Sequence, residues 1–351
     1  MRRVVTTRLA KTLAVVIALA AASAGCETDK NTHGGGKPAA GKTTYEIAVI
    51  PKGMTHDFWK SVEAGVRKAE KEINDAGEVI VRALWAGPQK ETERKKQIDY
   101  VRNFISRGVA GICLAPLDQD ALVSPVKDAM ADGIPVVIFD SGLTGEVGKD
   151  FISYVATNNR RGGQLGARRL GQLLGGKGKV ILLRYQVGSE STSQREEGFL
   201  EVMEKEFPGV EIISSNQYGG GTAQLSKQKS QNLLVRFGEE VDGIFTPNES
   251  TTFAMLLALR DAEFAGKVKF VGFDSSVQLV QGLRDGHLHG LVVQNPIKMG
   301  YESLRTIVRH LEGESVAREV DTGVAVVTKE NMDRPEMKEL HSPDLSRWLG
   351  D

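Results

Sequence analysis

Apolar runs of four to six residues alternate along this chain with longer segments in which apolar residues recur every three to four positions. Short apolar runs are typical of buried strands, and the longer spacing is typical of helices with one buried face. This alternation predicts an α/β protein with parallel sheets covered by helices on both faces. The predicted strands are 46–51, 79–84, 109–115, 135–139, 152–156, 179–184, 210–214, 242–246, 268–273 and 289–294.

Two helices and two domains follow from the same pattern. Roughly 300 residues are more than one hydrophobic core usually fills, so we expect two domains. The segment 153–163 interrupts the pattern, and a new series of strands and helices opens near Lys179. The helix faces are marked by Phe58, Val62, Val66, Ala69 and Ile73, and by Ile297, Tyr301, Leu304, Val308 and Leu311.

The amino terminus has the layout of a secretory signal peptide. Four basic residues precede an apolar run over 13–22, and small residues follow up to Cys26. This run is shorter than the roughly 20 residues that a membrane-spanning helix needs. A cysteine directly after small residues resembles a bacterial lipobox, in which the thiol is acylated, although Ser23 stands where leucine is usual. We therefore predict a signal peptide over 1–25 and, from this resemblance, lipid attachment at Cys26. Residues 26–44 are poor in large apolar side chains and are predicted to be a flexible linker.

Charge and cysteine content exclude several classes of function. Without residues 1–25 the chain keeps 41 basic and 45 acidic residues, a net charge of −4 that gives no support to nucleic-acid binding. Cys113 is then the only cysteine besides Cys26, so no intramolecular disulfide framework is expected. The apolar segment around Cys113 predicts a buried strand thiol. We expect no metal ion and no cofactor.

Polar or aromatic side chains stand where five apolar runs end. In an open parallel sheet the ligand crevice lies at the carboxyl ends of the strands, so these side chains should converge on one site for a small polar molecule. The five stretches are THDFW (55–59), VVIFD (136–140), GIFTPNE (243–249), FVGFD (270–274) and LVVQNP (291–296).

Over residues 45–330 the chain resembles the ribose-type periplasmic sugar-binding proteins, which are the solute receptors of ABC importers. Each of the motifs that carry the resemblance is short, and the six occur in the order that the family has. They are THDFW, PVVIFDS (135–141), SQREEGF (193–199), PNES (247–250), VGFD (271–274) and VVQNP (292–296).

The resemblance implies two Rossmann-like lobes that close on the ligand about three hinge crossovers, near 156–158, 294–295 and 320–322. Lobe 1 would then comprise about 45–156 plus 295–320, and lobe 2 about 157–294 plus 321–330, followed by a C-terminal tail over 331–351. The implied partners are a sugar or polyol, an ABC transporter permease and, through Cys26, a membrane; the receptor is expected to be a monomer.

Four polar residues are candidates to bind ligand hydroxyl groups. Asp140 and Asp274 follow strands, and their carboxylates can accept several hydrogen bonds, although each could instead cap a helix or form a turn. Asn248 and Gln294 offer both a donor and an acceptor, so each can bridge adjacent hydroxyls. Asn248 could equally cap a helix that begins at Glu249.

Three aromatic residues are candidates to cover the apolar face of a sugar ring. Phe58 and Trp59 open the first helix, and Phe273 could supply the opposite wall. Each could instead belong to the core. Stacking adds about 0.5–1.5 kcal/mol beyond area burial, whereas a hydrogen bond to a charged group contributes about 1.5–3 kcal/mol. The carboxylates should therefore determine specificity more than the rings.

Three further candidates depart from the ribose-binding pattern. His56 stands where that group commonly has asparagine, Ser141 where an arginine is common, and Ser193 where another arginine would reach the ring. Arg195 could serve in place of this second arginine, or pair with a neighbouring glutamate. These departures favour a sugar or polyol other than ribose.

Three other functions compete with that of a sugar-binding transport receptor. A repressor with the same two lobes would need an N-terminal helix-turn-helix, and the leader stands in its place. A secreted carbohydrate-active enzyme could use paired carboxylates, but neither a G-x-S-x-G motif nor a nucleophilic Cys/His pair accompanies them. A receptor that signals to a membrane protein would share every feature of a transport receptor. We therefore predict a binding protein and no enzyme.

Overall fold

The computed structural model describes residues 42–350. The predicted signal peptide, Cys26 and nearly all of the predicted linker lie outside the described residues. Within residues 42–350, no helix combines the length and the apolar character that crossing a bilayer requires.

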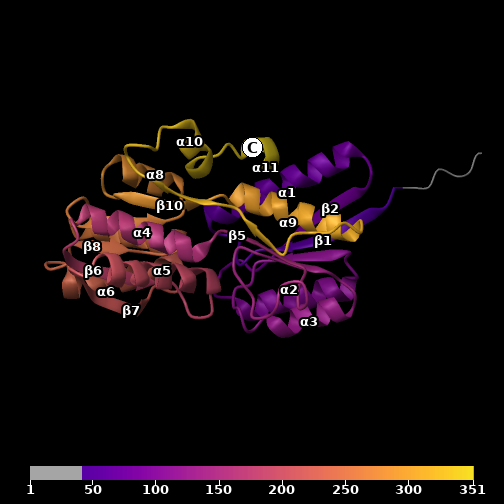
Figure 1. Ribbon diagram of the computed structural model, residues 1–351, viewed down its shortest axis with the longest axis horizontal. Helices are drawn as coiled ribbons and strands as arrows, with labels where there is room; N and C mark the ends of the chain where they lie inside the picture. The colour runs from indigo at the N-terminus through magenta and orange to yellow at the C-terminus, as the bar shows by residue number, and fades with distance from the viewer. Residues whose placement is uncertain (1–41, 351) are drawn as a thin grey trace, which may run out of the picture. The chain divides into compact units, whose positions relative to one another are not determined.

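The first sheet contains six parallel strands in the order β11-β5-β4-β3-β1-β2. Helices α1 (Asp57–Ala76) and α9 (Pro296–Leu311) cover one face, and α2 (Arg94–Arg107) and α3 (Val123–Ala131) cover the other (Figure 1). Alternate residues along each strand therefore enter two separate cores. The strands are β1 (Thr44–Ile50), β2 (Ile80–Trp85), β3 (Gly111–Leu114), β4 (Val136–Phe139), β5 (Ser153–Ala156) and β11 (Glu319–Asp321).

The second sheet has the order β12-β10-β9-β8-β6-β7, in which only β12 runs antiparallel to its neighbour. Helices α4 (Asn159–Leu173) and α5 (Glu190–Glu206) pack on one face. Helices α6 (Ala223–Phe237), α7 (Glu249–Asp261) and α8 (Val277–Arg284) pack on the other. The strands are β6 (Gly178–Arg184), β7 (Val210–Tyr218), β8 (Gly243–Phe245), β9 (Lys269–Phe273), β10 (Gly290–Gln294) and β12 (Val324–Val327).

The chain crosses between the two sheets three times: from β5 to α4, from β10 to α9, and from β11 to β12. Below, lobe 1 means the first sheet with α1, α2, α3 and α9, and lobe 2 means the second sheet with α4 to α8. The crossovers lie beside one another: Thr322 N–H donates to Ala156 O over 3.0 Å, and the Thr157 and Thr322 hydroxyls are 3.4 Å apart. Lys298 Nζ, near the start of α9, donates to Asp321 O over 3.3 Å. Three adjacent connections of this kind form a hinge.

Glycine allows α9 to join lobe 1 although it comes from the far end of the chain. A Cβ atom at Gly65 would lie 1.9 Å from Ile297 O, and one at Gly300 would lie 2.1 Å from Val62 O. The backbones of α1 and α9 are thus in direct contact. After β12, α10 (Pro335–His341) packs beside β10 and α11 (Ser346–Leu349) packs beside α1.

The structure confirms the α/β class and all ten predicted strands, which correspond to β1 through β10. Cys113 lies in β3 and is fully buried, as the pattern predicts. The sequence pattern missed β11 and β12. β11 (EVD) has no apolar run, so the pattern could not mark it. β12 (VAVV) is a four-residue apolar run of the kind that marks a strand, and it was overlooked.

Candidate functional site: a cavity between the two lobes

Two aspartates mark the carboxyl edges of the two sheets. Asp140 follows β4 in lobe 1 and Asp274 follows β9 in lobe 2, and both are buried. Their φ angles of 62° and 68° lie in the left-handed region, which residues other than glycine rarely adopt. Such backbone strain occurs most often at functional sites. The two turns direct both carboxylates toward the same space between the lobes.

That space is a small cavity lined by both lobes. Its walls combine aromatic rings with carboxylate, amide, ammonium and guanidinium groups, as expected for a small polar ligand. The lining residues are Lys52, Phe58, Trp59, Glu91 and Asp140 from lobe 1, and Tyr185, Ser191, Thr192, Arg195, Asn248, Asp274 and Gln294 from lobe 2.

Lys52 neutralises the lobe 1 aspartate. Its ammonium group lies 3.1 Å from Asp140 Oδ2, with both side chains about 95% buried. The same ammonium donates to the hydroxyls of Ser191 and Ser189, over 3.1 and 3.4 Å, and both serines belong to lobe 2. Lys52 therefore bridges the two lobes beside the cavity.

Glu91 is a second buried charged residue, and both of its carboxylate oxygens have polar partners. Its Oε1 lies 2.7 Å from His56 Nδ1 and accepts the Trp59 indole N–H over 2.8 Å. Its Oε2 accepts the hydroxyl of Tyr185, from lobe 2, over 2.6 Å. Burial alone would raise the pKa of Glu91, but His56, Lys52 and the Tyr185 hydrogen bond outweigh it and lower the pKa to about 2.

His56 is the cationic partner of Glu91. Burial alone would lower the pKa of His56, but the Glu91 carboxylate outweighs burial and raises the pKa to about 9. The histidine is therefore charged at neutral pH. Because Glu91 also holds the indole N–H, the pair fixes the orientation of Trp59, whose ring meets Phe58 edge to face at 4.9 Å.

Arg195 lines the lobe 2 side of the cavity. Its guanidinium carbon lies 3.9 Å from the centre of the Phe273 ring, an arrangement that attracts a cation to the ring face. Its Nε donates to Asn159 Oδ1 over 2.9 Å and its Nη1 to Pro247 O over 3.0 Å. The Nη2 atom is buried without a hydrogen-bond partner among the described residues.

Gln294 presents the complementary unsatisfied group. Its amide nitrogen donates to Asp274 Oδ1 over 2.7 Å, while its Oε1 is buried without a partner within residues 42–350. Burial raises the pKa of Asp274, although Arg195 and the hydrogen bond from Gln294 oppose the shift. Two residues that line the same cavity thus carry one unsatisfied donor and one unsatisfied acceptor.

The comparisons with known proteins agree with this architecture. Residues 47–315 match the family model described as a periplasmic binding protein domain. The chain belongs to the periplasmic binding protein family. Similar curated proteins include a D-ribose/D-allose-binding protein of Pseudomonas aeruginosa, 27% identical over 80% of this chain and 88% of the relative.

Two solved structures resemble this periplasmic binding protein across nearly their whole length. One is a carbohydrate transporter solute-binding protein from Agrobacterium radiobacter in complex with D-arabinose, with 31% identity, a TM-score of 0.78, and coverage of 85% of this chain and 98% of that one. The other is an ABC transporter solute-binding protein from Agrobacterium vitis with bound D-fucose, with 34% identity, a TM-score of 0.80, and coverage of 84% and 99%.

These findings confirm the resemblance to ribose-type sugar-binding proteins. The protein is a solute receptor of the ABC transport type and not an enzyme, and its family is periplasmic.

Most of the residues predicted from sequence meet at the cavity. Asn248 also takes the capping role that the sequence left open, since its Oδ1 accepts the Thr251 N–H over 3.3 Å at the start of α7. The predicted residues that line the cavity are Phe58, Trp59, Asp140, Arg195, Asn248, Asp274 and Gln294.

The other four predicted residues stand behind the wall or beside it. His56 acts through Glu91, and the fully buried Ser141 hydroxyl accepts the Ser191 N–H over 3.1 Å. Phe273 is fully buried beneath Arg195, so it supports the guanidinium instead of forming a wall. Ser193 is a half-buried residue of α5 that does not line the cavity, and Arg195, two residues further along, takes the place expected there.

Sequence reasoning missed Lys52, Glu91, Tyr185, Ser191 and Thr192. Lys52 and Tyr185 come within two residues of the ends of β1 and β6, so the strand-end rule could have found both. Glu91 lies in the loop after β2, where only the folded structure shows its three partners. Among these residues Lys52 matters most. Ser141 stands where an arginine is common, and Lys52 supplies the positive charge beside Asp140 instead.

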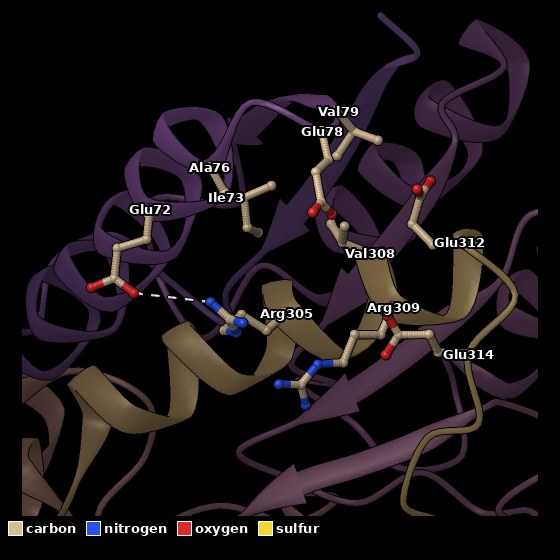
Figure 2. Close-up of a pocket in the computed structure, with 10 residues that line it drawn as sticks. All are labelled: Glu72, Ile73, Ala76, Glu78, Val79, Arg305, Val308, Arg309, Glu312 and Glu314. Carbon is tan, nitrogen blue, oxygen red and sulfur yellow. Dashed lines mark ion pairs between the residues drawn. The ribbon is translucent and has the colours of Figure 1, made fainter.

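A separate pocket lies between the C-terminal halves of α1 and α9 (Figure 2). Glu72 and Arg305 face each other there over 3.9 Å, and Glu78 and Glu314 lie at its border. None of the sequence-predicted site residues lines it. Among the described residues, no group of three or more metal-ligating side chains is found there or elsewhere.

The ion pair of His56 and Glu91 should make stability depend on pH. Because the pKa of His56 rises from 6.5 to about 9 on folding, its contribution is complete below pH 6.5 and is lost as the pH rises through 9. We expect the free energy of unfolding of the wild type to fall by about 1–3 kcal/mol relative to His56→Gln over this range. Urea unfolding between pH 6 and pH 9.5 measures the difference.

The exposed His310 of α9 offers a matched control, and His310→Gln should leave the pH dependence of the wild type unchanged. An identical pH dependence in wild type and His56→Gln would contradict the assignment of a charged His56.

Proposed function

We propose that the protein captures a neutral sugar or polyol in the cavity between its lobes and delivers it to the permease of an ABC importer. The observation that carries the proposal is a pair of buried unsatisfied atoms, Arg195 Nη2 and Gln294 Oε1, in two residues that line the cavity. Buried polar groups are nearly always hydrogen-bonded in folded proteins. A hydroxyl group, which both donates and accepts, would satisfy either of them.

The charges around the cavity favour a ligand without net charge. Lys52 forms an ion pair with Asp140, and His56 forms one with Glu91. The positive charge of Arg195 favours the charged form of Asp274. A charged ligand would add an unpaired charge to a buried, balanced set, which is costly. A sugar also offers apolar C–H faces for Phe58 and Trp59.

The contact residues proposed from sequence keep their roles with two changes. Asp140, Asp274, Asn248, Gln294 and Arg195 would bind hydroxyls or the ring oxygen, and Phe58 and Trp59 would cover the ring. His56, Ser141, Phe273 and Ser193 would act indirectly or not at all, and Lys52, Glu91 and Tyr185 join the wall. Relatives that hold D-arabinose and D-fucose support a pentose or a deoxyhexose as the first candidates.

We also propose that residues 1–25 are removed as a signal peptide and that Cys26 then carries a lipid anchor. The receptor would act as a monomer at the cell envelope, tethered by the residues that precede β1. The small residues before Cys26 and the basic, apolar leader support this proposal.

A melting-temperature screen tests the function. A ligand that binds only the native state raises the melting temperature, so the full chain should show a selective rise with one or a few neutral pentoses, hexoses, deoxy sugars or inositols. Uronic acids and amino sugars of matching stereochemistry are the charged controls. No shift from any neutral compound, or a larger shift from a charged one, would contradict the proposal.

Replacing Arg195 tests the proposed contact. In Arg195→Lys the fork of N–H donors is lost, so binding of the sugar that gives the largest shift should weaken by about 1.5–3 kcal/mol, or about 10- to 150-fold. Calorimetry provides the dissociation constant. Arg160→Lys, in an exposed ion pair with Glu197, is the control and should bind like the wild type. Equal affinity of Arg195→Lys and wild type would remove Arg195 from the site.

The anchor is tested separately. Cys26→Ser removes the only thiol that could be acylated, so the exported protein should move from the membrane fraction to the soluble fraction of the envelope. Immunoblotting of fractionated cells shows the distribution. If Cys26→Ser still sediments with membranes as the wild type does, Cys26 is not the anchor.

A further inference from the structure

Two glutamates of lobe 2 bind backbone N–H groups of lobe 1. Glu249 is the first residue of α7, and its Oε1 and Oε2 accept the N–H groups of Asp57 and Phe58 over 3.2 and 3.0 Å. Glu190 is the first residue of α5, and its Oε2 accepts the N–H of Gly142 over 2.8 Å. Each contact joins the two lobes directly.

Glu249 supplies a cap that lobe 1 does not provide for itself. The first N–H groups of a helix have no partner within the helix, and they attract negative charge. His56, at the N-cap position of α1, makes no side-chain capping bond. The N-terminus of α1 is therefore capped by a carboxylate from the other lobe.

Gly142 permits the second contact. A Cβ atom at this position would lie 2.8 Å from Glu190 Cδ, closer than real Cβ atoms approach, and 3.0 Å from its Oε2. The φ angle of Gly142 is not in the left-handed region, so the backbone itself would accept another residue. The absence of a side chain is needed only for the approach of Glu190.

Both contacts flank residues that line the cavity. Glu249 follows Asn248 in sequence, and its backbone N–H donates to Asp274 Oδ2 over 2.9 Å. Across the cleft it holds the N–H of Phe58. Glu190 precedes Ser191, and Gly142 lies two residues after Asp140. The ligand walls and the interlobe contacts are therefore parts of the same short segments.

We propose that Glu249 and Glu190 are positioning residues that hold the lobes closed around the ligand without contacting it. The inference rests on the proposed function, because closure matters for capture and release. Opening about the hinge would separate α1 from α7 and Gly142 from α5, and both sets of hydrogen bonds would be lost. The closed form would then be less populated, and a ligand that needs it would dissociate faster.

Interlobe distance in the ligand-free full chain is the first measurement. Fluorophores on exposed residues of α2 and α6 report it by energy transfer, at pH 8.5, where Glu249 is mainly ionised because burial raises its pKa only to about 7. Glu249→Ala and Glu190→Ala should each shift the distribution to longer distances than in the wild type. Glu204→Gln, an exposed glutamate of α5, changes the net charge of lobe 2 equally and should not.

Ligand kinetics provide the second measurement, with the sugar that gives the largest melting-temperature shift. Each alanine variant should release it about 10-fold faster at a nearly unchanged association rate. A merely structural defect would lower the active fraction and leave the dissociation rate of the remaining protein unchanged. If no sugar binds, the proposed function fails, while the distance measurement still tests the contacts.

A double-mutant cycle isolates the second contact. Gly142→Ala should open the lobes and speed release as Glu190→Ala does, and the combined variant should be no more open than either single variant. Additive effects would mean that Gly142 and Glu190 act separately. Unchanged distances and release rates in Glu249→Ala and Glu190→Ala would overturn the proposal.

Discussion

Buried charge in the cleft must be neutralised by residues that come from far apart in the chain. Lys52 beside Asp140, and His56 beside Glu91, are pairs in which an isolated charge would cost several kcal/mol. Each pair also has a partner in lobe 2, since Lys52 donates to Ser191 and Tyr185 donates to Glu91. The polar wall of the cavity is therefore complete only when the two lobes meet.

The topology brings these groups together. Parallel strands place all their carboxyl ends at one edge, and the two sheets turn those edges toward the same cavity. Three adjacent crossovers keep the lobes joined, and α9 returns to lobe 1 through a backbone contact that only Gly65 and Gly300 permit. A shared hinge and separate cores are the features that allow two lobes to move as units about a cleft.

The periodicity of the sequence predicted β1 to β10 because buried parallel strands are continuous apolar runs, and amphipathic helices with a different spacing of apolar residues separate them. Strand-end logic also located Asp140 and Asp274, whose left-handed backbone is a feature that sequence does not show. The sequence could not show which of Ser193 and Arg195 lines the cavity. The orientation of the Arg195 side chain depends on its packing over the Phe273 ring, which only the folded structure shows. Glu91 was missed for a related reason: its loop has no periodicity, and its three partners come from distant segments.

Closure and recognition are physically coupled in this cleft. Asn248 and Glu249 are adjacent, so a ligand hydroxyl bound by Asn248 would order both residues, and Glu249 caps α1 at the N–H groups of Asp57 and Phe58. Asp274 carries the same coupling, because it accepts both the Gln294 amide and the Glu249 backbone N–H. A ligand that fits the wall therefore also stabilises the contacts that close it, whereas a ligand that displaces Asp274 or Asn248 would weaken them. Selectivity in such a receptor arises from the stability of the closed form as well as from direct contacts.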